Sequence, residues 1–303
     1  MPKILAPESP LVARLAGLHL FGFDAAPCSQ RVACALAEKG LRRHRSVRWN
    51  DPREATLTAP PGTYVFRRVS LIKQEHLTAA YAAVQPNMVV PALVDDGRLF
   101  IESMDIIDYL DERVPEPALM PREPRRAELV RTLIDEGKAL HVSVRYVSFH
   151  WGLGRLGKLN AATEQRLREL ERDGSPEQLA AFYAGFNRDA IDAREYLEHL
   201  RALEHGYAQQ ETRLRSDGRP FLTGDTFTMA DIIWCMSVMR ILECGYPFGA
   251  RYPQLAAWFE RVRARAAFRD GVMRHHRGMH HLFRFKAVLE RWLGRGIDRA
   301  AAA

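Results

Sequence analysis

Long apolar runs and closely spaced cysteines are both missing from this chain. None of its 303 residues belongs to an apolar run of the ~18 residues that cross a membrane, so we expect no transmembrane segment. The first 17 residues lack a long apolar core and a clear cleavage site, and we expect no secretory signal. Its four cysteines (Cys28, Cys34, Cys235 and Cys244) have neither zinc spacing nor a CxxC pair, which favours a cytoplasmic protein with free thiols.

The charge excess is not concentrated in one block. The net charge is +7 and the pI about 9.4, but the arginines alternate with glutamates in segments such as 166–173 and 194–205. This alternation is typical of solvated helix faces, so we expect no nucleic-acid partner. A length of 303 residues with 47% hydrophobic content indicates two domains with ample core.

The most informative stretch is 88–106, which predicts a hairpin. An apolar strand at 89–94 and a second strand at 98–101 flank Asp95-Asp96-Gly97, and Asp-Gly between apolar runs is a strong hairpin signal. Pro91 has no N–H for a sheet ladder, so it indicates an edge position or a cis bond beside a ligand.

Glu102 and Ser103 come where this second strand gives way to an apolar helix. The free N–H groups at a helix start attract a carboxylate, and a serine hydroxyl can bind one as well. This corner is therefore predicted to bind a carboxylate.

A second candidate site lies near the N-terminus. A predicted strand at 18–23 leads into a helix that ends at Gly40, and Cys28 falls in the first turn of that helix, directly after Pro27. The helix dipole and the free N–H groups favour a thiolate at this position. Residue 31 is Arg rather than Cys, so any disulfide partner must come from another molecule. Cys34 is interpreted as a core residue.

These two motifs together resemble the cytosolic glutathione transferases of the cysteine type. The resemblance rests on V-P-A-L-V-D-D-G followed by E-S, and on a strand, a cysteine and a helix in that order. It implies a thioredoxin-like α/β domain followed by an all-helical domain, with glutathione as co-substrate. By position, Val90 and Pro91 would bind the cysteinyl backbone of glutathione, Glu102 and Ser103 its γ-glutamyl end, and Cys28 would be catalytic.

Within that family, the chain resembles the tetrachlorohydroquinone dehalogenase-like and ganglioside-induced differentiation-associated branch. The resemblance implies a homodimeric enzyme acting on a small hydrophobic electrophile, either by conjugation or by Cys28-mediated thiol transfer. The zeta-class isomerases carry Ser-Ser-Cys where this chain has Ala26-Pro27-Cys28, so an isomerase is a less favoured alternative. A non-catalytic interaction module is another.

We expect a glutathione-binding domain at 1–114, a linker at 115–124 and a helical domain at 125–303. The run at about 51–69 is interpreted as an insertion, and either 44–49 or 64–71 could be the second strand. A helical insertion at about 150–187 is expected to break at 174–176. Four of its aromatic residues are expected to help shape the electrophile site: Trp151, Phe182, Tyr183 and Phe186.

Two features concern the helical domain alone. Thr228 and Asp231 predict a capping box with a structural role. The basic C-terminal helix contains four histidines, but no carboxylate or cysteine lies close to them in sequence, and we expect no metal site: His275, His276, His280 and His281. Its apolar stripe is expected to dock on the body of the protein, with contact to a membrane surface as the less favoured alternative: Phe285, Val288, Leu289 and Trp292.

Overall fold

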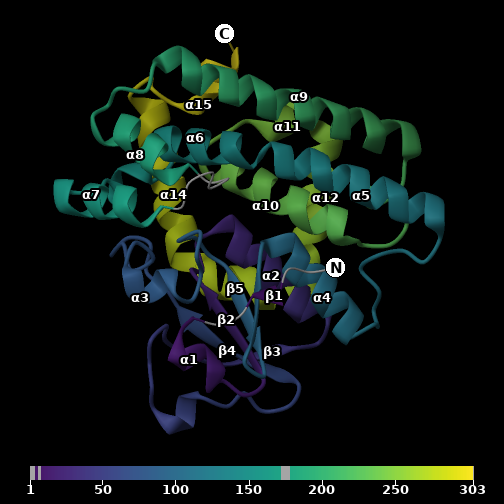
Figure 1. Cartoon of the computed structure of the whole chain (residues 1–303). Helices are drawn as coiled ribbons and strands as arrows, with labels where there is room; N and C mark the ends of the chain where they lie inside the picture. Colours follow the sequence, from purple (N-terminus) through teal and green to yellow (C-terminus); the bar gives the residue numbers. More distant parts are fainter. Residues whose placement is uncertain (1–3, 6–7, 172–177, 303) are drawn as a thin grey trace. The chain divides into compact units, whose positions relative to one another are not determined.

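The computed structural model describes residues 4–5, 8–171 and 178–302, so the expected helix break at 174–176 lies outside the described residues. The chain forms two compact units. One contains the chain up to residue 110 together with 156–191, and the other contains 111–155 and the chain from residue 192 (Figure 1). Within the described ranges, no helix combines the length and the apolar character needed to span a bilayer.

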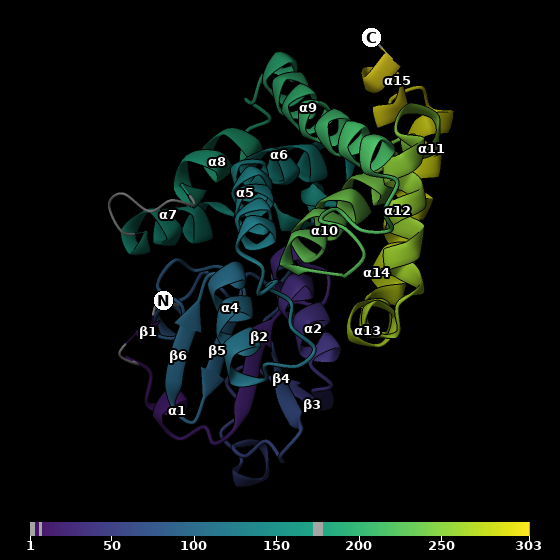
Figure 2. The ribbon, with the colours of Figure 1, turned by 90° about the vertical axis from the view of Figure 1, so that its right-hand side faces the viewer.

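A mixed sheet of six strands organises the first unit, in the order β1-β6-β5-β2-β4-β3 (Figure 2). β4 runs parallel to β2 and to β3, whereas β5 is antiparallel to β2 and to β6. All five residues of β2 are buried, as expected for a central strand. The strands are β1 (Ile4–Leu5), β2 (Leu18–Gly22), β3 (Arg42–Arg48), β4 (Thr63–Arg68), β5 (Ala92–Asp95) and β6 (Arg98–Ile101).

The predicted hairpin forms between β5 and β6. Asp96 and Gly97 both have positive φ, 49° and 76°, as a primed turn requires. β5 is shorter than predicted and begins at Ala92, because Pro91 has no N–H to contribute to the ladder. The Val90–Pro91 peptide bond is cis, as predicted.

Both candidates for the second strand are strands. The segment 44–49 overlaps β3, and 64–71 overlaps β4. β4 lies between β2 and β3, so the run at 51–69 contributes a strand to the interior of the sheet. The sequence left this choice open because either segment has the composition of a strand, and only pairing distinguishes an inner strand from an edge.

Helices of the first unit pack with the sheet. They are α1 (Pro10–Ala13), α2 (Pro27–Glu38), α3 (Ala79–Ala82) and α4 (Ser103–Arg113), with a 3₁₀ turn at Glu54–Thr56. α2 is buried at every position from 29 to 36, and Val32, Cys34 and Leu36 are fully buried, which agrees with Cys34 being a core residue. Figure 2 shows α2 and α4 beside the strands.

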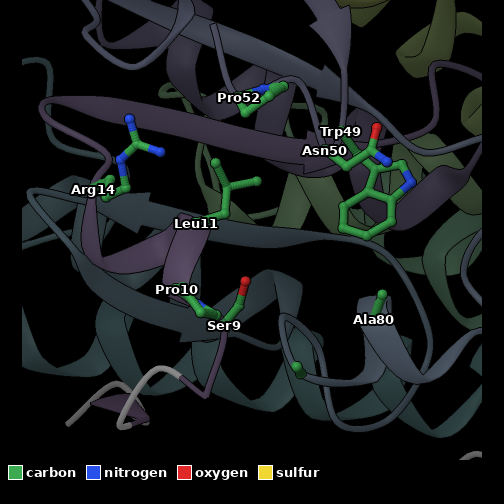
Figure 3. A pocket seen from close by; sticks show the side chains of 9 residues that line it. Ser9, Pro10, Leu11, Arg14, Trp49, Asn50, Pro52 and Ala80 are labelled. Atoms are coloured by element: carbon green, nitrogen blue, oxygen red, sulfur yellow. The ribbon is translucent and has the colours of Figure 1, made fainter. Parts of the chain in front are cut away.

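A pocket of about 340 Å³ opens in the first unit. Its lining comes from the N-terminal helical turn, the segment after β3 and helix α3 (Figure 3): Ser9, Pro10, Leu11, Arg14, Trp49, Asn50, Pro52, Ala80 and Ala83. No predicted site residue lines it.

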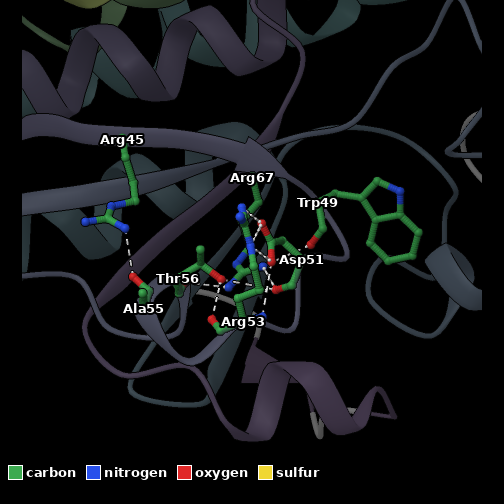
Figure 4. A network of polar contacts seen from close by, with 7 residues as sticks. All are labelled: Arg45, Trp49, Asp51, Arg53, Ala55, Thr56 and Arg67. Carbon is green, nitrogen blue, oxygen red and sulfur yellow. Dashed lines mark hydrogen bonds and ion pairs between the residues drawn. The ribbon is translucent and has the colours of Figure 1, made fainter.

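A buried guanidinium holds the segment after β3 in place. Arg67 of β4 donates from Nη1 to the carbonyl oxygens of Trp49 and Asp51, at 3.2 and 3.0 Å, and from Nη2 to that of Thr56 at 2.7 Å (Figure 4). Its Nε donates to Nδ1 of His19 at 3.2 Å. Burial lowers the pKa of Arg67 to about 10, so this side chain stays charged at neutral pH. One side chain therefore supplies donors to three buried carbonyls.

Residues 156–191 complete the first unit with α7 (Ala161–Leu170) and α8 (Leu179–Asn187). Gln74 donates to the carbonyl of Lys158 at 3.1 Å, and Glu164 accepts a bond of 2.8 Å from the Asn187 amide. The aromatic side chains of α8 are at most 6% exposed, and Trp151 of the second unit is 8% exposed. Such burial indicates packing rather than an open surface for an electrophile.

Helices make up the second unit. They are α5 (Pro124–Ala139), α6 (His141–Trp151), α9 (Ala193–Asp217), α10 (Met229–Glu243), α11 (Phe248–Arg251), α12 (Pro253–Ala264), α13 (Ala266–Phe268), α14 (Arg274–Trp292) and α15 (Ile297–Ala302), with a π-helical turn at Arg269–Met273. The capping box is present, because Asp231 accepts from the backbone N–H of Thr228 at 2.9 Å. Asp231 also accepts from Nε1 of Trp258 at 2.8 Å, which confirms its structural role.

The apolar stripe of α14 does not dock as expected. Phe285 is 68% exposed, Val288 66% and Trp292 81%. The helix instead buries the opposite side, through His276, Phe283 and Ala287. The sequence could not reveal this orientation, because α14 has apolar residues on both sides.

Candidate functional site

Cys28 lies in the first turn of α2, as the sequence predicts, and it is partly exposed. The loop before it is held by two side chains of the same turn. Ser29 Oγ accepts from the Phe23 N–H at 3.1 Å, and Gln30 donates to the carbonyl of Asp24 at 2.8 Å. The first N–H groups of an α-helix have no partner within the helix, and among the described residues no side chain caps the start of α2. The thiol therefore lies at the positive end of a helix dipole.

Arg31 is the residue that the sequence analysis did not assign to the site. Its Nη1 lies 3.6 Å from Cys28 Sγ and 3.4 Å from Ser103 Oγ, and the residue is only 4% exposed. A guanidinium at this distance stabilises a thiolate more than a thiol. Arg31 thus places a positive charge beside the thiol, where Ala26 and Pro27 offer no polar side chain.

The cis-proline corner is fixed from behind by a buried tyrosine. Tyr81 is fully buried and donates its hydroxyl to the carbonyl of Val89 at 2.9 Å. Burial raises the pKa of Tyr81, so the phenol stays protonated and continues to donate. Its ring meets Trp49 edge to face, with centroids 5.4 Å apart. The backbone at Val90 and Pro91 is thereby held on a rigid support at the start of β5.

Glu102 and Ser103 occupy the junction between β6 and α4, as predicted. Glu102 has φ of 66°, a left-handed conformation that costs a non-glycine residue about 1 kcal/mol. Its carbonyl accepts the N–H of Ile106 at 2.9 Å, and its exposed carboxylate accepts from the Asn87 amide at 3.2 Å. Strained backbone of this kind is concentrated at functional sites. Ser103 is the first residue of α4 and is buried beside Arg31.

The structure connects some of these predicted residues through two side chains that the sequence analysis did not assign to the site. Arg31 links Cys28 to Ser103, and Asn87 connects Glu102 to the loop that leads to Val90 and Pro91. Chemically, the arrangement offers a carboxylate, a serine hydroxyl and a helix start for a charged amino-acid end, next to a thiol beside a guanidinium. A signal for Arg31 existed in its i,i+3 spacing from Cys28. Asn87 gave no comparable signal, because its role depends on the fold of the 85–90 loop.

Comparison with known proteins gives two family matches. Residues 20–118 match the glutathione S-transferase N-terminal domain, and residues 177–266 match the glutathione S-transferase C-terminal domain. Among solved structures, the β-etherase LigF from Sphingobium sp. strain SYK-6 has a TM-score of 0.69 at 22% identity, covering 84% of this chain and 98% of that one. This likeness confirms the predicted fold of a thioredoxin-like domain followed by a helical domain.

Three curated relatives illustrate the range of activities named among similar proteins. The chain is 38% identical over 112 residues to maleylacetoacetate isomerase of Pseudomonas aeruginosa, a match spanning 36% of this chain and only 43% of that protein. It is 25% identical over 308 residues to 2,5-dichlorohydroquinone reductive dechlorinase of Sphingobium indicum, covering 90% of this chain and 86% of that protein. It is 30% identical over 198 residues to glutathione S-transferase theta-1 of Mus musculus, covering 65% and 70%. The chain therefore belongs to the glutathione S-transferase family, and the predicted class of glutathione-dependent transferase is confirmed at the level of that family.

Proposed function

We propose that this member of the family uses Cys28 as a nucleophile in glutathione-dependent thiol transfer on a small hydrophobic electrophile. The observation that carries the proposal is the 3.6 Å contact between Arg31 Nη1 and Cys28 Sγ. A buried guanidinium at a helix start favours a reactive thiolate, and residue 31 leaves no second cysteine in the motif to compete for it.

Glutathione binds, in this proposal, along the corner formed by Val90, Pro91, Glu102 and Ser103. Its γ-glutamyl carboxylate meets the start of α4 and the Ser103 hydroxyl, because free N–H groups at a helix start bind anions. Its ammonium group meets the Glu102 carboxylate, which is exposed. The cysteinyl peptide runs beside the backbone of Val90. This arrangement supports the placement of the glutathione sulfur next to Cys28.

The proposed reaction has two steps. The Cys28 thiolate attacks the sulfur of a glutathionyl thioether; the S–C bond breaks, its electron pair stays on the carbon, and that carbon takes a proton from water. A mixed disulfide between Cys28 and glutathione results. A second glutathione thiolate then attacks this disulfide at the glutathionyl sulfur, releasing glutathione disulfide and restoring Cys28. Overall, the carbon of the adduct is reduced, and its glutathionyl sulfur and one added glutathione thiol are oxidised to glutathione disulfide.

Thiol transfer is favoured over its alternatives by the cysteine and by the relative named as a reductive dechlorinase, which aligns with 90% of this chain. Simple conjugation needs no protein thiolate, because glutathione itself attacks the electrophile. A zeta-like isomerase is less favoured, since Ala26 and Pro27 offer no hydroxyl beside Cys28. A non-catalytic interaction module would not require Arg31 against the thiol.

The test compares Cys28→Ser with Cys34→Ser as the matched control, because Cys34 lies on the same helix but is fully buried. Each protein is assayed for release of glutathione from an aryl thioether and for conjugation of an aryl halide. Cys28→Ser should abolish release and retain some conjugation, and Cys34→Ser should keep both activities. Full release by Cys28→Ser would leave a conjugating transferase as the function.

We also propose that the protein is cytoplasmic and forms a homodimer. The four free cysteines, three of them buried, support a reducing compartment such as the cytoplasm. Homodimerisation is proposed from the family resemblance, and light scattering on the purified protein tests it.

The second substrate is sought with a panel of aryl halides, quinones, glutathione adducts and disulfides, each assayed with glutathione.

A further inference from the structure

The C-terminal histidines meet a carboxylate from a distant part of the second unit. Glu243 is the last residue of α10, and His276 and His280 lie one turn apart on the same face of α14. His276 Nε2 is 2.6 Å from Glu243 Oε1, and His280 Nδ1 is 2.8 Å from the same oxygen. Two imidazole nitrogens therefore converge on one carboxylate oxygen.

The burial of these three side chains is uneven. The side chains of Glu243 and His276 are fully buried, and that of His280 is 22% exposed. One ligand atom from each residue lies within 4.8 Å of the other two. Two imidazoles and one carboxylate form a donor set that suits zinc and related divalent ions. The partial exposure of His280 gives an ion a route to the site from solvent.

The second oxygen of the carboxylate has a different environment. Among the described residues, Glu243 Oε2 accepts no hydrogen bond, and Arg240 Nη1 lies 3.8 Å from it. The guanidinium occupies the Oε2 side, and the two histidines occupy the Oε1 side. Its positive charge opposes a cation, so binding should be weaker than in a structural zinc site built without a nearby arginine.

We propose that Glu243, His276 and His280 bind one divalent transition-metal ion of the zinc type, which links α10 to α14. With metal–nitrogen bonds of about 2.1 Å in a tetrahedral site, neighbouring ligand atoms lie about 3.4 Å apart. The present separations of 2.6 and 2.8 Å must therefore open by about 0.6–0.8 Å when an ion binds. The alternative is a purely hydrogen-bonded trio in which protons occupy the place of the ion.

The experiment uses the full chain without a histidine tag, dialysed against a chelator and then titrated with Co²⁺. Cobalt bound by imidazole and carboxylate absorbs visibly, so the spectrum reports the ligands as well as the stoichiometry. We expect one Co²⁺ per chain, displaced by Zn²⁺, and a rise in the melting temperature when Zn²⁺ is present. A chain that gives no cobalt spectrum and no shift in melting would overturn the proposal.

Variants distinguish this trio from the other histidines. His280→Ala and Glu243→Gln should each weaken Co²⁺ binding by more than about 10-fold. His281→Ala is the matched control, because that residue is exposed on the same helix and lies outside the trio, and it should bind as the unaltered chain does. Circular dichroism checks the fold of each variant. Equal loss in His281→Ala, or full binding in a folded His280→Ala, would refute the assignment.

Discussion

Replacing Arg31 tests the proposed chemistry most directly. Arg31→Met keeps the length and much of the packing of the side chain but removes the charge from beside Cys28. Arg31→Lys keeps the charge but not the planar fork whose Nη1 lies 3.6 Å from Cys28 and 3.4 Å from Ser103. The two variants together separate the effect of charge from that of geometry.

The expected change in the thiolate population of Cys28 follows from its contact with Arg31. A hydrogen bond to a charged group contributes about 1.5–3 kcal/mol. Since 1.4 kcal/mol is a factor of ten in an equilibrium, loss of the Arg31 contact should lower the thiolate population of Cys28 by about 10- to 100-fold. Arg31→Lys should fall between the unaltered chain and Arg31→Met.

The assay is alkylation by iodoacetamide at pH 6, followed by mass spectrometry of the peptide that contains Cys28. The other three cysteines are buried and act as slow internal references. Burial raises the pKa of one of them, Cys244, to about 12. Cys28 should be alkylated fastest in the unaltered chain and at least about 10-fold more slowly in Arg31→Met. If a folded Arg31→Met reacts at the original rate, Arg31 does not activate the thiol.

Three further outcomes are expected. Ser103→Ala and Glu102→Gln should each weaken glutathione binding, by about 1.5–3 kcal/mol, with little change in melting temperature; calorimetry showing unaltered affinity would contradict the binding corner. Burial lowers the pKa of His76 to about 4, so the folded state favours the neutral imidazole. The resulting contribution to the free energy of unfolding is complete above the ordinary pKa of 6.5 and is lost as the pH falls toward 4. Between pH 8 and pH 5, the free energy of unfolding in urea should fall by about 2 kcal/mol less in His76→Gln than in the unaltered chain, with exposed His281→Gln as control. Arg67→Met should lower the free energy of unfolding by about 3 kcal/mol, since three buried carbonyls lose their donor; a loss below about 1 kcal/mol would show that water replaces it.

Local signals made much of the first unit predictable. The Asp96-Gly97 turn, the proline before β5 and the cysteine after Pro27 each act within a few residues, so composition and spacing suffice to recognise them. The division between α5 and α6 shows the limit. It lies at Leu140, where ψ is −3°, and neither Leu140 nor His141 is a proline or glycine that would announce a break.

Contacts between distant segments could not be predicted in the same way. The contact of Arg31 with Ser103 spans 72 residues, and that of His276 with Glu243 spans 33. Each depends on how two elements pack, which periodicity within either element does not specify. The histidines lacked a nearby carboxylate in sequence, and the fold supplies one from another helix.

The first unit is built from two separate segments of the chain, which has a consequence for synthesis of the protein. The chain passes from one unit to the other between residues 110 and 111, 155 and 156, and 191 and 192. All six strands have been made by residue 101, yet α7 and α8 are made only after the whole of 111–155. The partner of Gln74, the carbonyl of Lys158, follows it by 84 residues. A nascent chain can therefore assemble the sheet early, but it completes the first unit only after α5 and α6 of the second have been made, so formation of the first unit spans the synthesis of part of the second.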